Sequence, residues 1–226
     1  MKALALSLIV TAAALSSAQF VYPKPEYNVH DPSVYKEDPF IVEYRHKFFS
    51  VFRGDFKTFD TAFTEIKGMV AKNPNDARAL VWEGNGETIQ ATLDYVSGKK
   101  DQVEPLIESS RKTLDAAVRL RPDDPNIYMM RVATLYVQAQ FLPPSFIPMS
   151  NWAKIASDCE RFIRFIGPER IRKVSIHVRG EAYGELGLAR EKLGDKAGAR
   201  KAFEELIALN PNTDYETRAR KEIAKL

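Results

Sequence analysis

The chain has 226 residues, of which 45% are hydrophobic and 28% are charged, a balance that is typical of a folded globular protein and excludes general disorder. Its one cysteine excludes an internal disulfide and a cysteine-rich zinc or iron–sulfur framework. With 33 basic and 30 acidic residues the formal net charge is only +3, so the composition gives no reason to expect a nucleic acid partner.

The first 18 residues have the pattern of a secretory signal peptide. Lys2 precedes an uncharged apolar run over 3–15, and small residues follow up to Ala18. We expect cleavage after Ala18, which gives an exported protein, periplasmic or secreted, without stable membrane insertion after cleavage. The alternative is a retained membrane anchor, which the polar residues after the run and the prolines beyond them disfavour.

Residues 19–38 predict an extended arm that either stays free or lies along the body of the protein. Prolines remove backbone donors and disfavour helix, whereas tyrosines offer apolar rings for packing. The arm contains three of each, namely Pro23, Pro25, Pro32, Tyr22, Tyr27 and Tyr35. Asp38-Pro39 then has the pattern of a helix N-cap followed by proline at the first helical position.

From residue 39 to 226, apolar residues at spacings of three and four predict helices throughout. The expected helices run from 39 to the turn at 54–55, from there to 72, and over about 76–96, 103–121, 126–141, 150–166, 169–193, 196–209 and 214–225. No stretch has a strand pattern, so the predicted fold class is all-α. The last helix is apolar on one face only, as the terminal cap of a stacked array must be.

The helix pair near the C-terminus carries a repeat signature. With Gly180 as position 1, positions 4, 7, 8, 20, 24 and 32 are Tyr183, Leu186, Gly187, Ala199, Phe203 and Pro211. This pattern resembles the tetratricopeptide repeat, in which small residues let paired helices approach and large ones fill the seam. In earlier pairs Ala62 and Gly84 match positions 20 and 8.

The resemblance implies a right-handed α-solenoid of about four helix pairs and a C-terminal capping helix. The prolines that end successive pairs are 43 to 48 residues apart, whereas regular tetratricopeptide repeats have a period of 34. An irregular α-solenoid is therefore the structural alternative for the first three pairs.

The resemblance also implies a concave groove lined by the first helix of each pair. The groove positions fall on Arg78, Val81, Trp82, Asn85, Thr88 and Ile89 in the second pair, and on Ile127, Met130, Arg131, Thr134, Val137 and Gln138 in the third. Repeats that clamp a terminal carboxylate have lysine where this chain has Val81, so we expect a groove for an internal segment of a protein or peptide partner.

The expected function is that of an exported, non-enzymatic protein-binding scaffold. The alternatives are a structural subunit of a cell-envelope complex and an enzyme whose site is assembled from scattered side chains. No catalytic constellation, metal site or cofactor motif occurs, since His30, His46 and His177 are dispersed and Cys159 lies on an apolar face.

Two surface features have competing interpretations. The basic clusters at 99–100 and 170–173 are interpreted as solvated helix ends. The proline-rich segment 142–149 either contacts a partner or a membrane, or folds back over the third helix pair, and the second interpretation is favoured because large apolar side chains are usually covered.

Overall fold

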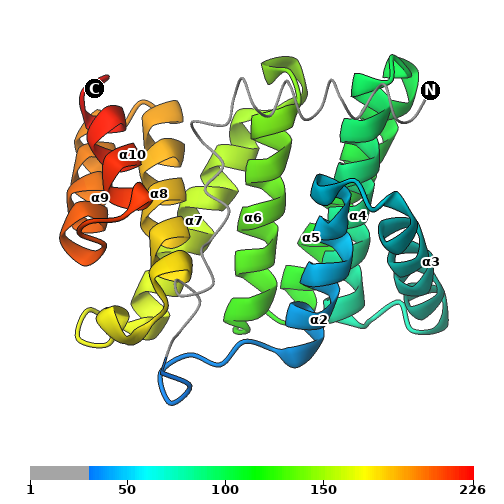
Figure 1. The fold of residues 1–226 in the computed structure, drawn as a ribbon, viewed down its shortest axis with the longest axis horizontal. Helices are drawn as coiled ribbons and strands as arrows, with labels where there is room; N and C mark the ends of the chain where they lie inside the picture. Colours follow the sequence, from blue (N-terminus) through cyan, green and yellow to red (C-terminus); the bar gives the residue numbers. More distant parts are fainter. Residues whose placement is uncertain (1–30) are drawn as a thin grey trace. The chain divides into compact units, whose positions relative to one another are not determined.

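The computed structural model describes residues 31–226. Within this range the secondary structure consists of α-helices and short 3-10 helices, with no strand, which confirms the all-α prediction. The α-helices are α2 (Pro39–Phe48), α3 (Phe56–Lys72), α4 (Ala77–Val96), α5 (Val103–Leu120), α6 (Pro125–Phe141), α7 (Met149–Ile166), α8 (Ile176–Lys192), α9 (Lys196–Leu209) and α10 (Asp214–Ile223) (Figure 1). The 3-10 helices are η2 (Phe49–Arg53), η3 (Lys100–Gln102), η4 (Pro144–Phe146) and η5 (Ile171–Lys173). The expected signal peptide and residues 19–30 of the arm lie outside the described residues.

Aspartate side chains start most of these helices. In each case a carboxylate oxygen accepts a hydrogen bond from a free backbone N–H of the first turn, which satisfies a group that the helix itself leaves unpaired. The capping residues are Asp38, Asp55, Asp76, Asp124 and Asp195. Because these caps are readable in the sequence, the starts of α2, α4, α6 and α9 lie within one residue of the expected positions.

The described residues form two compact units. Unit 1 comprises residues 37–147 and contains α2 to α6, and unit 2 comprises residues 31–36 and 148–226 and contains α7 to α10. Each unit has its own buried core. The two helices that were expected to form the third pair, α6 and α7, therefore belong to different units.

Unit 1 is built around α4, which contacts α2, α3, α5 and α6. An aromatic cluster fills the side toward α2 and α3, where the ring of Phe48 lies 4.8 Å from Trp82 and 5.5 Å from Phe59. Glycines let the neighbouring helices approach: a Cβ at Gly84 would lie 2.8 Å from Leu114, and one at Gly86 would meet the ring of Phe63.

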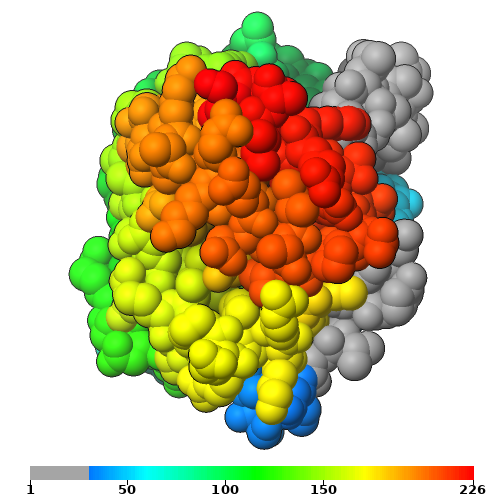
Figure 2. Space-filling model, turned by 90° about the vertical axis from the view of Figure 1, so that its left-hand side faces the viewer, coloured from blue at the N-terminus to red at the C-terminus, as the bar shows by residue number. Residues whose placement is uncertain are grey.

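Unit 2 is held together by the seam between α8, α9 and α10. Its core cluster consists of Ala199, Phe203, Leu206, Tyr215 and Ala219, all of them buried. Figure 2 shows the outer surface of α9 in orange and of α10 in red. Asp214, Arg220 and Lys221 of α10 remain exposed, as expected of a terminal helix, whereas Arg218 and Glu222 are buried.

The described part of the arm belongs to the core of unit 2. Tyr35 is 6% exposed, and its ring packs edge-on against Phe162 at 5.4 Å. The backbone N–H of Asp31 donates a hydrogen bond to the carbonyl of Lys173. Of the two outcomes expected for the arm, packing along the body therefore holds for this part.

The long helix expected over 169–193 starts later, at Ile176. Pro168 follows Gly167, and the chain then makes a turn and η5 before Ser175 caps α8. Arg179 fixes this turn, because its guanidinium donates to the carbonyls of Arg172, Val174 and Leu209. Apolar periodicity did not reveal this change of direction.

Segment 142–149 folds back, but over the second helix pair and not over the third. Leu142 is buried against α4 and α5, and the ring of Phe146 lies 6.3 Å from Tyr95. Arg111 donates a hydrogen bond of 2.7 Å to the carbonyl of Phe146. Leu142, Phe146 and Ile147 thereby pack within unit 1, whereas Met149 is exposed.

Candidate partner-binding surface

Most of the residues expected to line the groove are buried. Only Arg78 and Arg131 are partly exposed, while ten others are inaccessible, namely Val81, Trp82, Asn85, Thr88, Ile89, Ile127, Met130, Thr134, Val137 and Gln138. The expectation of an open groove along α4 and α6 is thus corrected. The physical reason is that α6 packs directly on α4, while α2 covers Trp82.

The polar groove residues form a hydrogen-bonded seam between α4, α5 and α6. Asn85 donates to the hydroxyl of Thr134 at 3.0 Å. The amide of Gln138 donates to the hydroxyls of Thr88 at 2.9 Å and Ser110 at 3.2 Å. Since buried polar groups are costly when unpaired, this seam fixes the register of three helices and leaves these groups unavailable to a partner.

The two arginines are engaged as well. Arg131 forms an ion pair of 2.9 Å with Asp115. Asn85 and Arg131 stand at positions that clamp a terminal carboxylate in some tetratricopeptide repeats, and both have partners within unit 1. Since Val81 also replaces the lysine of that pattern, this face has no free carboxylate clamp.

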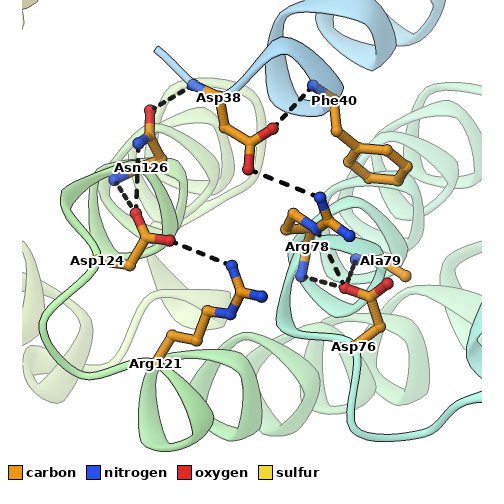
Figure 3. Close-up of polar contacts among 8 residues, drawn as sticks. All are labelled: Asp38, Phe40, Asp76, Arg78, Ala79, Arg121, Asp124 and Asn126. Atoms are coloured by element: carbon orange, nitrogen blue, oxygen red, sulfur yellow. Dashed lines mark hydrogen bonds and ion pairs between the residues drawn. The ribbon is translucent and has the colours of Figure 1, made fainter. Parts of the chain in front are cut away.

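Arg78 lies where the first turns of α2, α4 and α6 meet (Figure 3). Its guanidinium is 4.0 Å from Asp38 and 3.5 Å from Asp76, the N-caps of α2 and α4, and stacks over the ring of Phe40. The backbone N–H of Asp38 donates to the side chain of Asn126 in α6. Arg78 therefore joins helix starts, although its side chain remains 37% exposed.

One apolar hollow remains beside the buried groove positions. It is lined by Val51, Phe52, Ile89, Thr92, Leu93, Val137 and Phe141, and its volume is about 20 Å³. That volume accommodates a single water molecule or methyl group. Ile89 and Val137 are expected groove residues. Val51 and Phe52 of η2 belong to the apolar pattern of the helix expected to run from residue 39 to the turn at 54–55, but that pattern does not indicate that they meet α4 and α6.

In unit 2 the same repeat register places positions 2, 6 and 12 on Glu181, Glu185 and Glu191. Glu181 and Glu191 are partly exposed, but Glu185 is 3% exposed and lies 3.5 Å from Arg218 of α10. Burial raises the pKa of Glu185 to about 8, despite the opposing charge of Arg218. Two carboxylates of this face, Glu181 and Glu191, are therefore accessible, and the exposed Lys192 follows them at position 13.

The expected packing residues of the fourth pair lie where the signature requires. A Cβ added at Gly187 would lie 2.5 Å from the ring of Phe203, and one at Gly180 would lie 2.7 Å from Tyr215. Ala199 and Leu186 are buried, Tyr183 packs against the same cluster, and the exposed Pro211 follows the end of α9. In the first pair Ala62 is also buried.

No catalytic arrangement emerges among residues 31–226. Cys159 is buried as expected, and burial raises the pKa of its thiol well above the usual value. The His177 ring lies between the hydroxyl of Tyr215 at 2.7 Å and Glu181 at 3.5 Å, which joins α8 to α10. Within the same range no group of three or more potential metal ligands occurs.

The comparisons with known proteins agree with this helix pairing. The family model described as tetratricopeptide repeat matches residues 180–213, which contain most of α8 and all of α9. No match was found among curated proteins or among solved structures. Over the described range, no helix has the length and apolar character needed to cross a membrane. The signature residues, the packing of α8 on α9 and the matched family model together identify residues 180–213 as a tetratricopeptide repeat.

Proposed function

We propose that this protein is an exported, non-enzymatic scaffold that holds a segment of a partner protein. The observation that supports it most is the tetratricopeptide repeat at 180–213, because such repeats are protein-interaction modules. Export rests on the pattern of residues 1–18.

The proposed contact face is the exposed side of α8. In unit 1 the corresponding face is filled by side chains, whereas in unit 2 Glu181 and Glu191 retain solvent access. Two carboxylates separated by about 15 Å along one helix favour an extended segment that carries lysine or arginine. Partly exposed ion pairs contribute modestly to affinity and strongly to association rate and salt dependence.

The test is affinity purification of the exported protein from its native envelope fraction, with mass spectrometry of what it captures. Glu181→Lys with Glu191→Lys should lose the partner. The matched control is Glu204→Lys with Glu205→Lys, which makes the same charge change at exposed positions of α9. Equal capture by both variants would remove α8 as the contact face, and no specific capture by the wild type would remove the scaffold proposal.

Export is tested separately by the mass of the protein recovered outside the cytoplasm. We expect a mature chain that begins at Gln19. Recovery of the intact chain in the membrane fraction would instead establish the retained anchor.

A further inference from the structure

The end of α7 and the turn that follows it present a cationic patch with an exposed aromatic ring. We define this patch as Arg164, Phe165, Arg170, Arg172 and Lys173. All five side chains are exposed, Arg164 at 69% and Phe165 at 48%. In Figure 2 this stretch is yellow and lies at the surface at the lower edge of the face.

Helix ends account for part of this charge. Arg170 donates to the carbonyls of Phe165 and Ile166 in the last turn of α7, and Arg172 lies 3.4 Å from the carbonyl of Ala208 near the end of α9. Such contacts complement the negative ends of two helix dipoles. They leave the guanidinium charges in place and exposed. Arg164, which also lies in the last turn of α7, adds a further exposed cation.

Nearby acidic groups offset only part of the four positive charges. Glu169 lies within the turn, and Asp31 faces Lys173. Glu160 lies 3.7 Å from Arg164 but also pairs with Arg190 at 2.9 Å, so its charge is shared. The patch therefore retains a positive excess at the surface.

Phe165 adds an exposed apolar ring next to Arg164 in the sequence. It belongs to α7, but it lies outside the apolar face that buries Phe162 and Ile166. Cations beside an exposed aromatic ring, carried on a helix end and a turn, match the interfacial region of an anionic bilayer. There the cations lie near lipid phosphates and the ring enters the headgroup region.

We propose that this patch docks unit 2 on an anionic lipid surface. The inference goes beyond the proposed scaffold function and does not depend on the contact face of α8. An acidic protein segment is the competing occupant, and the experiment below separates the two.

The experiment is co-sedimentation of the chain beginning at Gln19 with vesicles. That chain contains every described residue and lacks the apolar run 3–15, which would itself bind lipid. Vesicles of phosphatidylglycerol and phosphatidylcholine are compared with vesicles of phosphatidylcholine alone. Binding is measured at about 0.1 M and about 1 M salt, between which the Debye length falls from about 10 Å to about 3 Å.

We expect binding to the anionic vesicles only, and loss of most of it at the higher salt concentration. Each cation near such a surface changes the partition coefficient by about fivefold. Arg164→Glu with Lys173→Glu should therefore lower it by at least about 25-fold while keeping the arginines that cap helices. The matched control, Lys192→Glu with Lys201→Glu, changes exposed cations elsewhere in unit 2 and should stay within about twofold of wild type.

Phe165→Ser should weaken binding to the same vesicles by several fold, because it removes the ring and leaves every charge. Circular dichroism melting confirms that each variant is folded. The proposal is overturned if the wild type ignores anionic vesicles or if Arg164→Glu with Lys173→Glu binds as well as the control. It is also overturned if poly-glutamate binds the patch while Phe165→Ser leaves vesicle binding unchanged, which would assign the patch to an acidic protein segment.

Discussion

Glu185 places a carboxyl group inside unit 2, where α8 and α10 meet. Around it lie Arg218 of α10, Glu181 of α8 and the buried Cys159 of α7. Because burial raises its pKa to about 8 from an ordinary 4.5, the folded protein holds a proton that the unfolded chain has lost over this interval. The free energy of unfolding should therefore fall as the pH rises from about 4.5 to about 8.

A pH series of thermal melts tests this linkage. The wild type should melt at a lower temperature at pH 8 than at pH 5.5, and Glu185→Gln should remove part of the difference because glutamine cannot ionise. A remaining slope is expected from Glu87, whose pKa burial raises to about 7. Glu204→Gln, at an exposed position, should keep the full wild-type slope, and an unchanged slope in Glu185→Gln would contradict the assignment.

Glycine is required at position 187 because another side chain occupies the space of its missing Cβ. We expect Gly187→Ala to lower the free energy of unfolding by roughly 1–3 kcal/mol, since the Phe203 ring is packed and has to shift. Gly68 is the matched control, because it also lies within a helix but a Cβ there meets nothing within 4 Å. Gly68→Ala should stabilise by roughly 0.5–1 kcal/mol, and urea denaturation measures both.

At the scale of elements, the pairing of α8 and α9 depends on Phe203 and Ala199. Phe203→Ala should cost about 3–5 kcal/mol by leaving a cavity at the seam, and Ala199→Leu about 1–3 kcal/mol by overpacking it. Both residues are fully buried. Ala208→Leu, at an exposed position of the same helix, should change stability by less than about 0.5 kcal/mol. Stable variants at 199 and 203 would refute the packing account of the signature.

Helix boundaries were predictable where a capping residue or a stop signal marks them. The expected bounds of α9 agree with the structure, because Gly194-Asp195 and Asn210-Pro211 mark both ends. The start of α8 was missed by seven residues. There the turn is held by hydrogen bonds from the Arg179 guanidinium to backbone carbonyls. Such bonds do not depend on the spacing of apolar residues, so the periodicity of the sequence does not predict them.

The candidate groove was less predictable than the fold. Position 85 is readable as a groove position from the repeat register, but whether a neighbouring helix covers it depends on the approach of α6 to α4. Thr134 and Gln138 are predicted as groove residues in the same way, although a polar residue on a helix face can have two meanings. It indicates solvent or a partner when that face is open, and a buried hydrogen-bonded seam when it is covered.

At the scale of the whole molecule, residues 31–36 of the arm contribute to the free energy of unfolding of unit 2 through Tyr35. Tyr35→Ala should lower the free energy of unfolding by about 3 kcal/mol, because the ring that contacts Phe162 is lost from a buried site. Tyr35→Phe keeps the ring and should retain most of that stability. If Tyr35→Ala melts like the wild type, then the arm does not contribute to the core, and deletion of residues 19–37 should also be tolerated.

From residue 31 onward the chain passes through unit 2, then unit 1, then unit 2 again, and this sequence imposes an order on folding. Residues 31–36 leave the ribosome, or a translocation channel, before their packing partners in α7 exist. Within the described residues unit 1 is contiguous and can close over mainly local contacts. Tyr35, in contrast, has no packing partner until Phe162, which follows unit 1 in the sequence, has emerged. Unit 2 therefore remains incomplete until synthesis or export is nearly finished. In that interval Tyr35 has not yet packed against Phe162, and the unfolded segment around it is accessible to chaperones and proteases.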